Sequence, residues 1–175
     1  METTIQKMYD KIADIKTVMM VTRRADGHLV SRAMAMQKVA PGADLWFVAG
    51  EGSAKLDEIR EDPHINLSCS DPKTMEWISI SGRASLSKDR TIIQQLYASD
   101  WKAWFPDEGD PRHGTADDPR IVLIGVHVDG AVFFEVDKPR PVVLYEIVKG
   151  WMTGKMPDIG ELHHIDAPPP RKTGT

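Results

Sequence analysis

The residues with the clearest potential for chemistry are two cations, Arg32 and Lys55, and the hydroxyl of Ser53. Ser53 precedes a run typical of a helix, so it is predicted to be the N-cap residue. Lys55 then stands in the first helical turn, where the helix dipole favours an anion over a cation. A bound phosphate would remove this conflict, because it binds free N–H groups at the helix start while the lysine neutralises its charge. In the alternative interpretation Lys55 points to solvent, and Asp57 and Glu58 supply the favourable charges.

A predicted strand at 28–39 contains the other cation, Arg32. Period-two alternation places Arg32 in an otherwise apolar row with Val30 and Met34. The opposite face carries short side chains such as Ser31 and Ala33, which would let a planar group approach the backbone. The strand is therefore compatible with a flat ligand, and equally with an arginine at a barrel rim beside small residues that pack a helix.

Composition and charge restrict the possible classes of function. The chain has 175 residues, 27% of them charged and 41% hydrophobic, which is typical of one globular domain. A formal net charge of -4 without a basic stripe argues against nucleic-acid binding. The longest apolar stretch, 121–128, is too short to span a bilayer, so no membrane association is expected. The first residues lack the apolar segment of a signal peptide, and Cys69 has no second cysteine, so a cytoplasmic location is expected.

The pattern of elements predicts an antiparallel β protein. A helix is expected at 4–15 and further helices at 53–61 and 88–99, with an ordered loop at 100–119. Six or seven strands with hairpin spacing favour a barrel or sandwich with helices packed outside. We expect one domain over 1–165, a disordered tail at 166–175, and strands at 17–22, 28–39, 44–49, 64–70, 75–86, 121–128 and 131–136, the last two forming a hairpin through Asp129-Gly130.

Other chemically active side chains give weaker signals. His163 and His164 are adjacent, so along a strand they would face opposite ways, and no metal site is expected. Cys69 is predicted to be a buried structural thiol rather than a nucleophile. The acidic run 107–118 lacks the ligand spacing of a calcium loop and is predicted to be solvated.

Five short motifs, in this order and spacing, resemble the general stress protein branch of the FMN-binding split-barrel superfamily that includes pyridoxamine 5′-phosphate oxidase. The resemblance covers roughly residues 5–137. Three substitutions depart from the family pattern: Ala33 replaces a proline, Ala49 a threonine and Phe134 a tryptophan. The motifs are 32-RAM-34, 45-LWFVA-49, 53-SAK-55, 78-ISISG-82 and 104-WFPDEGDP-111.

The resemblance implies a seven- or six-stranded antiparallel split β-barrel that binds FMN, rather than FAD or a deazaflavin, in a cleft of a homodimer. Arg32, Ser53 and Lys55 would hold the phosphate. The backbone at Ala33, Met34, Phe47 and Val48 would edge the isoalloxazine ring, and Trp77 or Trp104 of the second subunit could cover it.

The implied function is that of a small flavin-dependent redox protein, with the substrate unidentified. Two alternatives stay open: a module that sequesters or senses a flavin without turnover, and a deazaflavin-dependent reductase on the same barrel. Residues 138–175 indicate a short helix and a Pro-rich tail instead of the strand that closes the oxidase site. The chain is therefore not expected to oxidise pyridoxamine 5′-phosphate efficiently.

Overall fold

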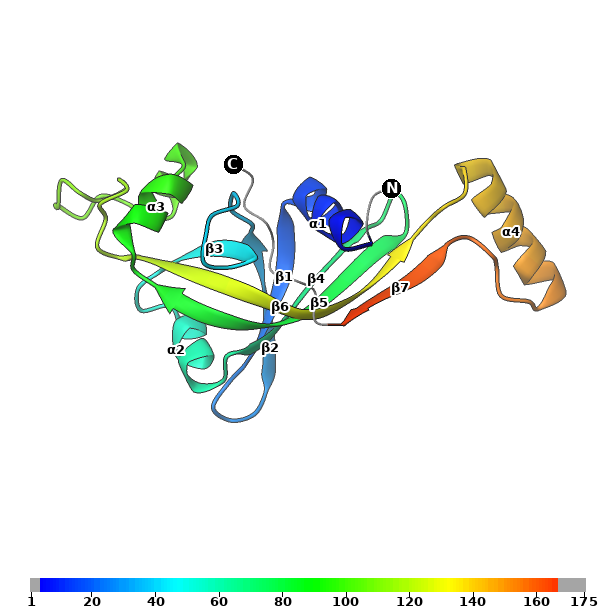
Figure 1. Ribbon diagram of the computed structural model, residues 1–175, viewed down its shortest axis with the longest axis horizontal. Coiled ribbons are helices and arrows are strands. Elements are labelled where there is room, and N and C mark those ends of the chain that lie inside the picture. The colour runs from blue at the N-terminus through cyan, green and yellow to red at the C-terminus, as the bar shows by residue number, and fades with distance from the viewer. Residues whose placement is uncertain (1–3, 167–175) are drawn as a thin grey trace.

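The computed structural model describes residues 4–166 and contains one sheet of seven antiparallel strands with four α-helices (Figure 1). The fold is therefore the predicted mainly β architecture with peripheral helices. In chain order the elements are α1 (Thr4–Ile15), β1 (Thr17–Arg23), β2 (Leu29–Ala35), β3 (Leu45–Gly50), α2 (Ala54–Glu61), β4 (His64–Asp71), β5 (Glu76–Ser87), α3 (Arg90–Leu96), a 3-10 helix (Ser99–Ala103), β6 (Ile121–Glu135), α4 (Arg140–Thr153) and β7 (Glu161–Asp166).

The sheet has the strand order β2-β1-β4-β5-β6-β3, with β7 paired to β6 outside this order, and it is curled into a barrel. Its two end strands approach each other where β2 runs out, because the N–H of Gln37 donates to the carbonyl of Trp46 at 2.8 Å. β2 stops at Ala35, four residues before the expected end, and this contact lies in the irregular segment that follows. The contact brings β2 and β3 together, and these two strands carry Arg32 and the ring residues expected from the sequence, while Ser53 and Lys55 lie at the start of α2.

β6 is a single strand of 15 residues, so the predicted hairpin at Asp129-Gly130 is wrong. Along β5 the register shifts at this point: Gly82 pairs with Val128 and Ser81 with Gly130, which leaves Asp129 as an extra residue. This β-bulge changes the alternation, because the core-facing positions are even-numbered up to Val128 and odd-numbered from Ala131 onward. Gly82 allows the close approach, since a Cβ there would lie 2.5 Å from the carbonyl oxygen of His127.

Two clusters of buried side chains hold the molecule together. The larger fills the barrel and is covered by α1, whose Met8 and Ile12 are fully buried. The smaller lies outside the barrel, where α3 and the 3-10 helix pack against β3 and β6. Trp101 and Phe105 belong to this smaller cluster, which therefore fixes the start of the loop 104–120, called the aromatic loop below.

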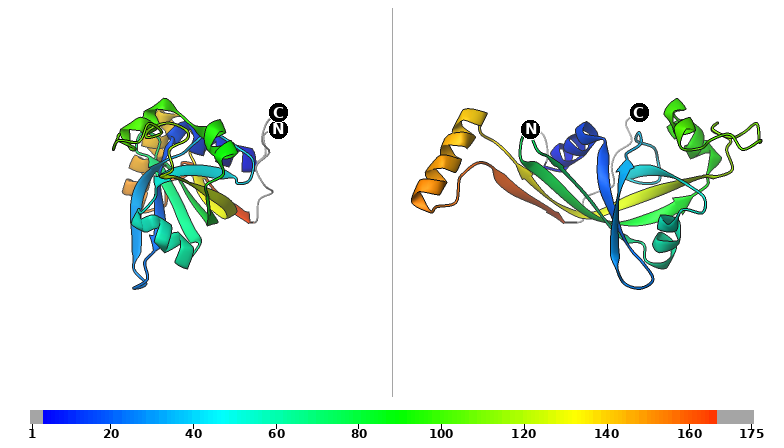
Figure 2. Two further views of the ribbon diagram at one scale, coloured as in Figure 1. Left: turned by 90° about the vertical axis from the view of Figure 1, so that its left-hand side faces the viewer. Right: turned by 180° about the vertical axis from the view of Figure 1, so that it is seen from behind.

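The C-terminal part forms an arm that projects from the barrel, with α4 at its far end and α3 at the opposite end of the molecule (Figures 1 and 2). The predicted helix is present as α4, but the expected absence of a closing strand is wrong, because β7 pairs with the distal half of β6. The missed strand is short, and its adjacent histidines hide the alternation. Asp166, assigned to the tail, ends β7; the rest of the predicted tail lies outside the described residues. No helix among residues 4–166 is long and apolar enough to cross a membrane.

Candidate functional site

A cavity of about 480 Å³ opens between β2, β3, the start of α2 and the aromatic loop. This volume is within the range of small-molecule and cofactor sites. Its walls combine two cations with short and aromatic side chains, which suits an anionic ligand that has a flat apolar part. The lining residues are Arg32, Ala33, Met34, Ala35, Val48, Ala49, Gly50, Lys55, Trp104 and Phe105.

Arg32 is held in the cavity wall by a polar network that sequence reasoning missed. Its guanidinium donates to a Glu58 carboxylate oxygen at 2.8 Å and to the Thr22 hydroxyl at 2.5 Å. That hydroxyl in turn donates to the same Glu58 oxygen at 2.5 Å. The side chains of Arg32 and Glu58 are only 23% and 11% exposed. The arginine is thus oriented, and its charge is partly balanced, by a carboxylate from α2.

The start of α2 supplies an unsatisfied hydroxyl. Ser53 is the N-cap residue, as predicted, but its side chain makes no capping hydrogen bond. Its Oγ is buried and has no hydrogen-bond partner among the described residues. A buried polar atom without a partner is costly, and such atoms in native proteins commonly face a ligand or water. Gly52, with φ at +83°, makes the sharp turn that presents this serine.

Lys55 is half-buried beside the same point. Burial lowers its pKa, the positive charge of Arg32 lowers the pKa further, and only Glu58 acts in the opposite direction. Two cations that disfavour each other, next to an unpaired hydroxyl, form a site that a phosphate dianion would stabilise. Lys55 is thus a half-buried cation in the cavity wall and is not fully exposed to solvent.

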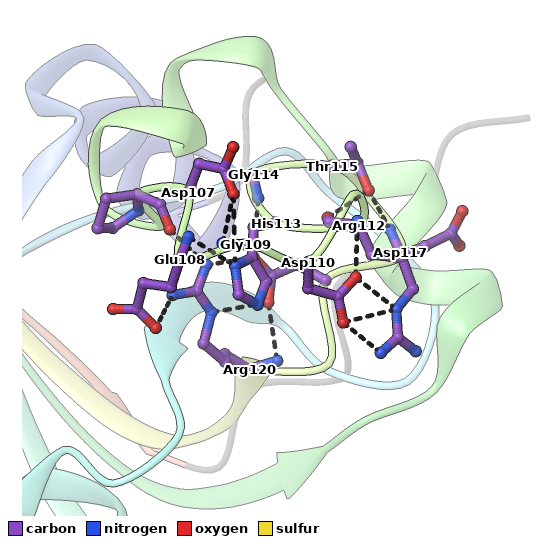
Figure 3. Close-up of polar contacts among 12 residues, drawn as sticks. Asp107, Glu108, Gly109, Asp110, Arg112, His113, Gly114, Thr115, Asp117 and Arg120 are labelled. Atoms are coloured by element: carbon purple, nitrogen blue, oxygen red, sulfur yellow. Dashed lines mark hydrogen bonds and ion pairs between the residues drawn. The ribbon is translucent and has the colours of Figure 1, made fainter.

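The aromatic wall comes from the loop between the 3-10 helix and β6. Trp104 is 80% exposed, whereas Phe105 is buried, and both line the cavity. Figure 3 shows how the following residues are fixed: Arg112 binds the Asp110 carboxylate at 2.6 Å, and Arg120 binds Glu108 at 3.1 Å. The acidic run is consequently an ordered set of turns whose carboxylates pair with arginines and backbone N–H groups.

The structure brings together six of the nine residues expected at the site: Arg32, Ala33, Met34, Val48, Lys55 and Trp104. Trp104 lines the cavity of its own chain, whereas the resemblance implied a contact from the second subunit. Ser53 lies next to this group, as the neighbour of α2's first residue. Phe47 is fully buried in the barrel core and does not line the cavity. Trp77 is on β5 and lines a different cavity with Met19 and Cys69, so a contact with the ligand would need a second subunit.

Six further residues contribute to the site without having been expected there. Two of them act through Arg32, Thr22 and Glu58, and four lie in the wall, Ala35, Ala49, Gly50 and Phe105. Their sequence signal was partly visible. Phe105 follows Trp104 in the aromatic motif, and Glu58 lies one helical turn after Lys55. The partnership of Glu58 with Arg32 joins residues 26 positions apart and leaves no local pattern.

The remaining candidates lie away from this cavity. His163 faces inward and stacks on Phe133 at 4.7 Å between ring centroids, while His164 is exposed. Burial raises the pKa of the Cys69 thiol to about 11, so the reactive thiolate is disfavoured. Within residues 4–166 no group of three or more His, Cys, Asp or Glu side chains gathers at a distance that could hold a metal ion.

Comparison with known proteins shows similarity over most of the chain. A family model described as "Pyridoxamine 5'-phosphate oxidase like" matches residues 3–158. The chain is also 36% identical over 153 residues to the protein bli-3 of Neurospora crassa, a match that covers 86% of this chain and 73% of that protein.

Solved structures share the fold. A general stress protein 26 from Jannaschia sp. CCS1 superposes with a TM-score of 0.69 at 23% identity, covering 93% of this chain and 97% of that one. The general stress protein 26 of Bacillus anthracis gives a TM-score of 0.58 at 22% identity, with 72% and 92% covered. A protein from Nostoc punctiforme, named as a pyridoxamine 5′-phosphate oxidase-related, FMN binding protein, gives 0.57 at 18% identity, with 72% and 78% covered. With a family model matched over most of its length, this chain belongs to the pyridoxamine 5′-phosphate oxidase-like family.

Proposed function

We propose that this protein binds FMN in the cavity between β2, β3, α2 and the aromatic loop. The observation that carries the proposal is the buried, unpartnered hydroxyl of Ser53 next to the two cations Arg32 and Lys55. These three groups would hold the phosphate, with the free N–H groups of α2. The short side chains of Ala33 and Ala35 and the backbone of Val48 would lie beside the isoalloxazine ring.

The family and the Nostoc relative named as FMN binding support a flavin as the ligand. FMN suits the site better than FAD does, because a terminal phosphate matches a pair of cations at a helix start. A deazaflavin cofactor is a less suitable occupant for the same reason.

Titration of the purified protein with FMN and with riboflavin, by calorimetry and by the visible flavin spectrum, tests the proposal. FMN should bind at least tenfold more tightly than riboflavin, since only FMN carries the phosphate. Equal affinities would show that Arg32, Ser53 and Lys55 do not bind a phosphate. If neither FMN nor riboflavin bound, the cavity would be excluded as a flavin site.

We further propose that the protein is a redox protein. Bound FMN supplies hydride and single-electron transfer, and the protein residues supply binding and orientation. Val48 and the alanines of β2 would exclude water from one side of the ring, while the open side next to Trp104 would admit a small substrate. A module that only sequesters or senses the flavin is the alternative, and reduction by NADH or NADPH under anaerobic conditions separates the two.

We also propose that the protein is a homodimer, because α4 is apolar on nearly every side and yet buries only Val143. Leu144, Tyr145 and Trp151 are 64%, 63% and 86% exposed, at the tip of an arm distant from the barrel (Figure 1). An exposed apolar helix of this kind marks an interface, and a twofold pair of identical chains is the commonest solution. A cytoplasmic location is proposed from the single cysteine.

A further inference from the structure

We propose that the ion pair between Asp118 and Arg120 is a positioning unit that holds Phe105 in place as the aromatic wall of the flavin cavity. This inference rests on the proposed function and extends it to residues that do not themselves touch the ligand. It concerns the 17 or so residues between the 3-10 helix and β6, where neither a strand nor an α-helix fixes the backbone.

Asp118 is fully buried, and both of its carboxylate oxygens are used within the loop. It accepts hydrogen bonds from the N–H of Gly114 at 2.8 Å and from the N–H of Arg120 at 2.9 Å. The guanidinium of Arg120 binds both oxygens, with Nε at 3.1 Å and Nη2 at 2.8 Å. Arg120 holds the pKa of Asp118 well below its usual range, so the pair stays charged at all ordinary pH values.

Arg120 extends this anchor to the cavity wall. Its guanidinium carbon lies 5.8 Å from the centroid of the Phe105 ring, a cation–π distance, and Nη2 also donates to the carbonyl of Pro106 at 2.9 Å. Its own carbonyl accepts from the N–H of Glu51 at 2.7 Å, directly beside Gly50 of the cavity lining. One arginine thus contacts the loop on the side of Phe105 and the end of β3.

Phe105 links the anchor to the ligand site. It is 4% exposed and lines the cavity, and its ring lies 3.7 Å from the position that a Cβ on Gly50 would occupy. The next residue toward the N-terminus is the exposed Trp104, so a shift of Phe105 would move both aromatic residues of the wall. Removing the anchor should therefore loosen the ring end of the cavity and leave the phosphate end, on α2 and β2, unchanged.

Arg120→Lys is the first test, since lysine keeps the charge but cannot bind both carboxylate oxygens or stack as a plane. Asp118→Asn is the second, with the same shape and no charge. Arg112→Lys is the matched control: Arg112 binds Asp110 in the same loop with the same forked geometry but does not contact Phe105 or the cavity.

Both test variants should lower the affinity for FMN and the affinity for riboflavin by the same factor. We expect about threefold to thirtyfold, the range of a partly desolvated cation–π contact. The FMN-to-riboflavin ratio should stay at the wild-type value, and the control should bind both flavins normally. In the Phe105→Leu background, Arg120→Lys should cause no further loss of flavin affinity, because Arg120 acts through the Phe105 ring. Combined with Lys55→Ala, the two losses should multiply.

Hydrogen–deuterium exchange of the flavin-free protein gives a readout independent of the ligand. Exchange should rise in 103–108 for Arg120→Lys and only in 110–115 for Arg112→Lys. If the wild type bound neither flavin, the proposed function would fail, and this exchange pattern would still decide the role of the pair. Unchanged flavin affinity and unchanged exchange at 103–108 would overturn the inference, as would independent, multiplying losses with Phe105→Leu. It would also be overturned if both test variants failed to fold at 25 °C, since the pair would then be a determinant of folding.

Discussion

Arg32 and Glu58 face each other across 2.8 Å at the edge of the cavity, and each is mostly shielded from water. The arginine comes from β2 and the glutamate from α2, so the pair fastens the helix to the barrel at the proposed phosphate site. Glu58 also opposes that site electrostatically, because its negative charge lies near the position where a phosphate would bind. The pair orients Arg32 and at the same time limits the affinity for an anion.

Replacing Lys55 with alanine should weaken FMN binding by about tenfold to a hundredfold, the loss of one charge-assisted hydrogen bond of about 1.5–3 kcal/mol. Riboflavin affinity should not change, because the lysine acts on the phosphate alone. The flavin-free variant should be slightly more stable, since a half-buried cation leaves the start of α2. Calorimetry and thermal unfolding measure these quantities, with Lys73→Ala as the control at an exposed lysine outside this cavity. Normal FMN affinity would return Lys55 to a solvent-facing role.

Glu58→Gln should strengthen FMN binding several-fold while lowering the stability of the flavin-free protein. The glutamine can still accept from Arg32, but the carboxylate that balances the arginine and repels phosphate is gone. Chemical denaturation with and without saturating FMN separates the two effects, since the ligand should restore much of the lost stability. A weaker affinity for FMN would mean that orientation by Glu58 outweighs its repulsion.

FMN affinity should fall as the pH rises, beginning below the ordinary lysine range. In the free protein the pKa of Lys55 is lowered by burial and by Arg32, whereas a bound phosphate would raise it. Binding therefore takes up a proton between the two pKa values, and affinity declines with pH across that window. The stability of the flavin-free protein has the opposite dependence on pH. Between the folded and the unfolded pKa of Lys55 the unfolded chain binds more protons, so the free energy of unfolding rises with pH. Titrations between pH 7 and pH 10.5 should show the decline for FMN and none from this lysine for riboflavin.

Trp151→Glu should convert a dimer into a monomer, because it places a charge on the apolar tip of the arm. Light scattering coupled to gel filtration measures the mass. Lys102→Ala, at an exposed residue in the 3-10 helix, controls for the same change of one unit of net charge. A wild-type protein that is monomeric and still retains FMN would contradict the proposed assembly.

The protein should form little pyridoxal 5′-phosphate from pyridoxamine 5′-phosphate. That reaction needs a second phosphate site above the ring, and Arg140, the arginine in the described part of the C-terminal region, lies instead on a separate groove between α4 and the β4–β5 turn. Without an oriented amine above the ring, flavin alone gives slow turnover. A steady-state assay of the FMN-loaded protein decides this, and formation of the aldehyde at ordinary enzyme rates would refute it.

The mainly β fold was predictable from the pattern of strands, and the residues proposed for the phosphate end were identified from local signals. The serine before the helix and the lysine in its first turn lie within three consecutive positions. Alternation alone places Arg32 on the face of β2 opposite its small residues. The ring end was less accessible. Phe47 faces the core in this structure, and the anchor of Phe105 depends on Asp118 and Arg120, which sequence reasoning did not connect with the aromatic motif.

The errors in the fold arise from interrupted patterns. In β6 the inward-facing residues change from even to odd positions near Asp129-Gly130, and a break in alternation beside that dipeptide is also typical of a hairpin. In β7 two adjacent histidines hide a short alternation, and its pairing with β6 is long-range. The bulge in β6 cannot be distinguished from a hairpin, nor β7 from irregular chain, without knowledge of the neighbouring strands.

The bulge at Asp129 also sets how the chain tolerates changes in length. One strand pairs with β3 through its first half and with β7 through its second half, and the extra residue between them sets the phase of the arm relative to the barrel. Deleting that single residue would leave Phe133 inward and Val132 outward, because it removes the extra residue and makes the alternation of β6 continuous. Deleting Gly130 as well would reverse the phase and turn Phe133 outward and Val132 inward, so changes of length at the bulge should be tolerated according to the alternation that they leave, more than according to their size.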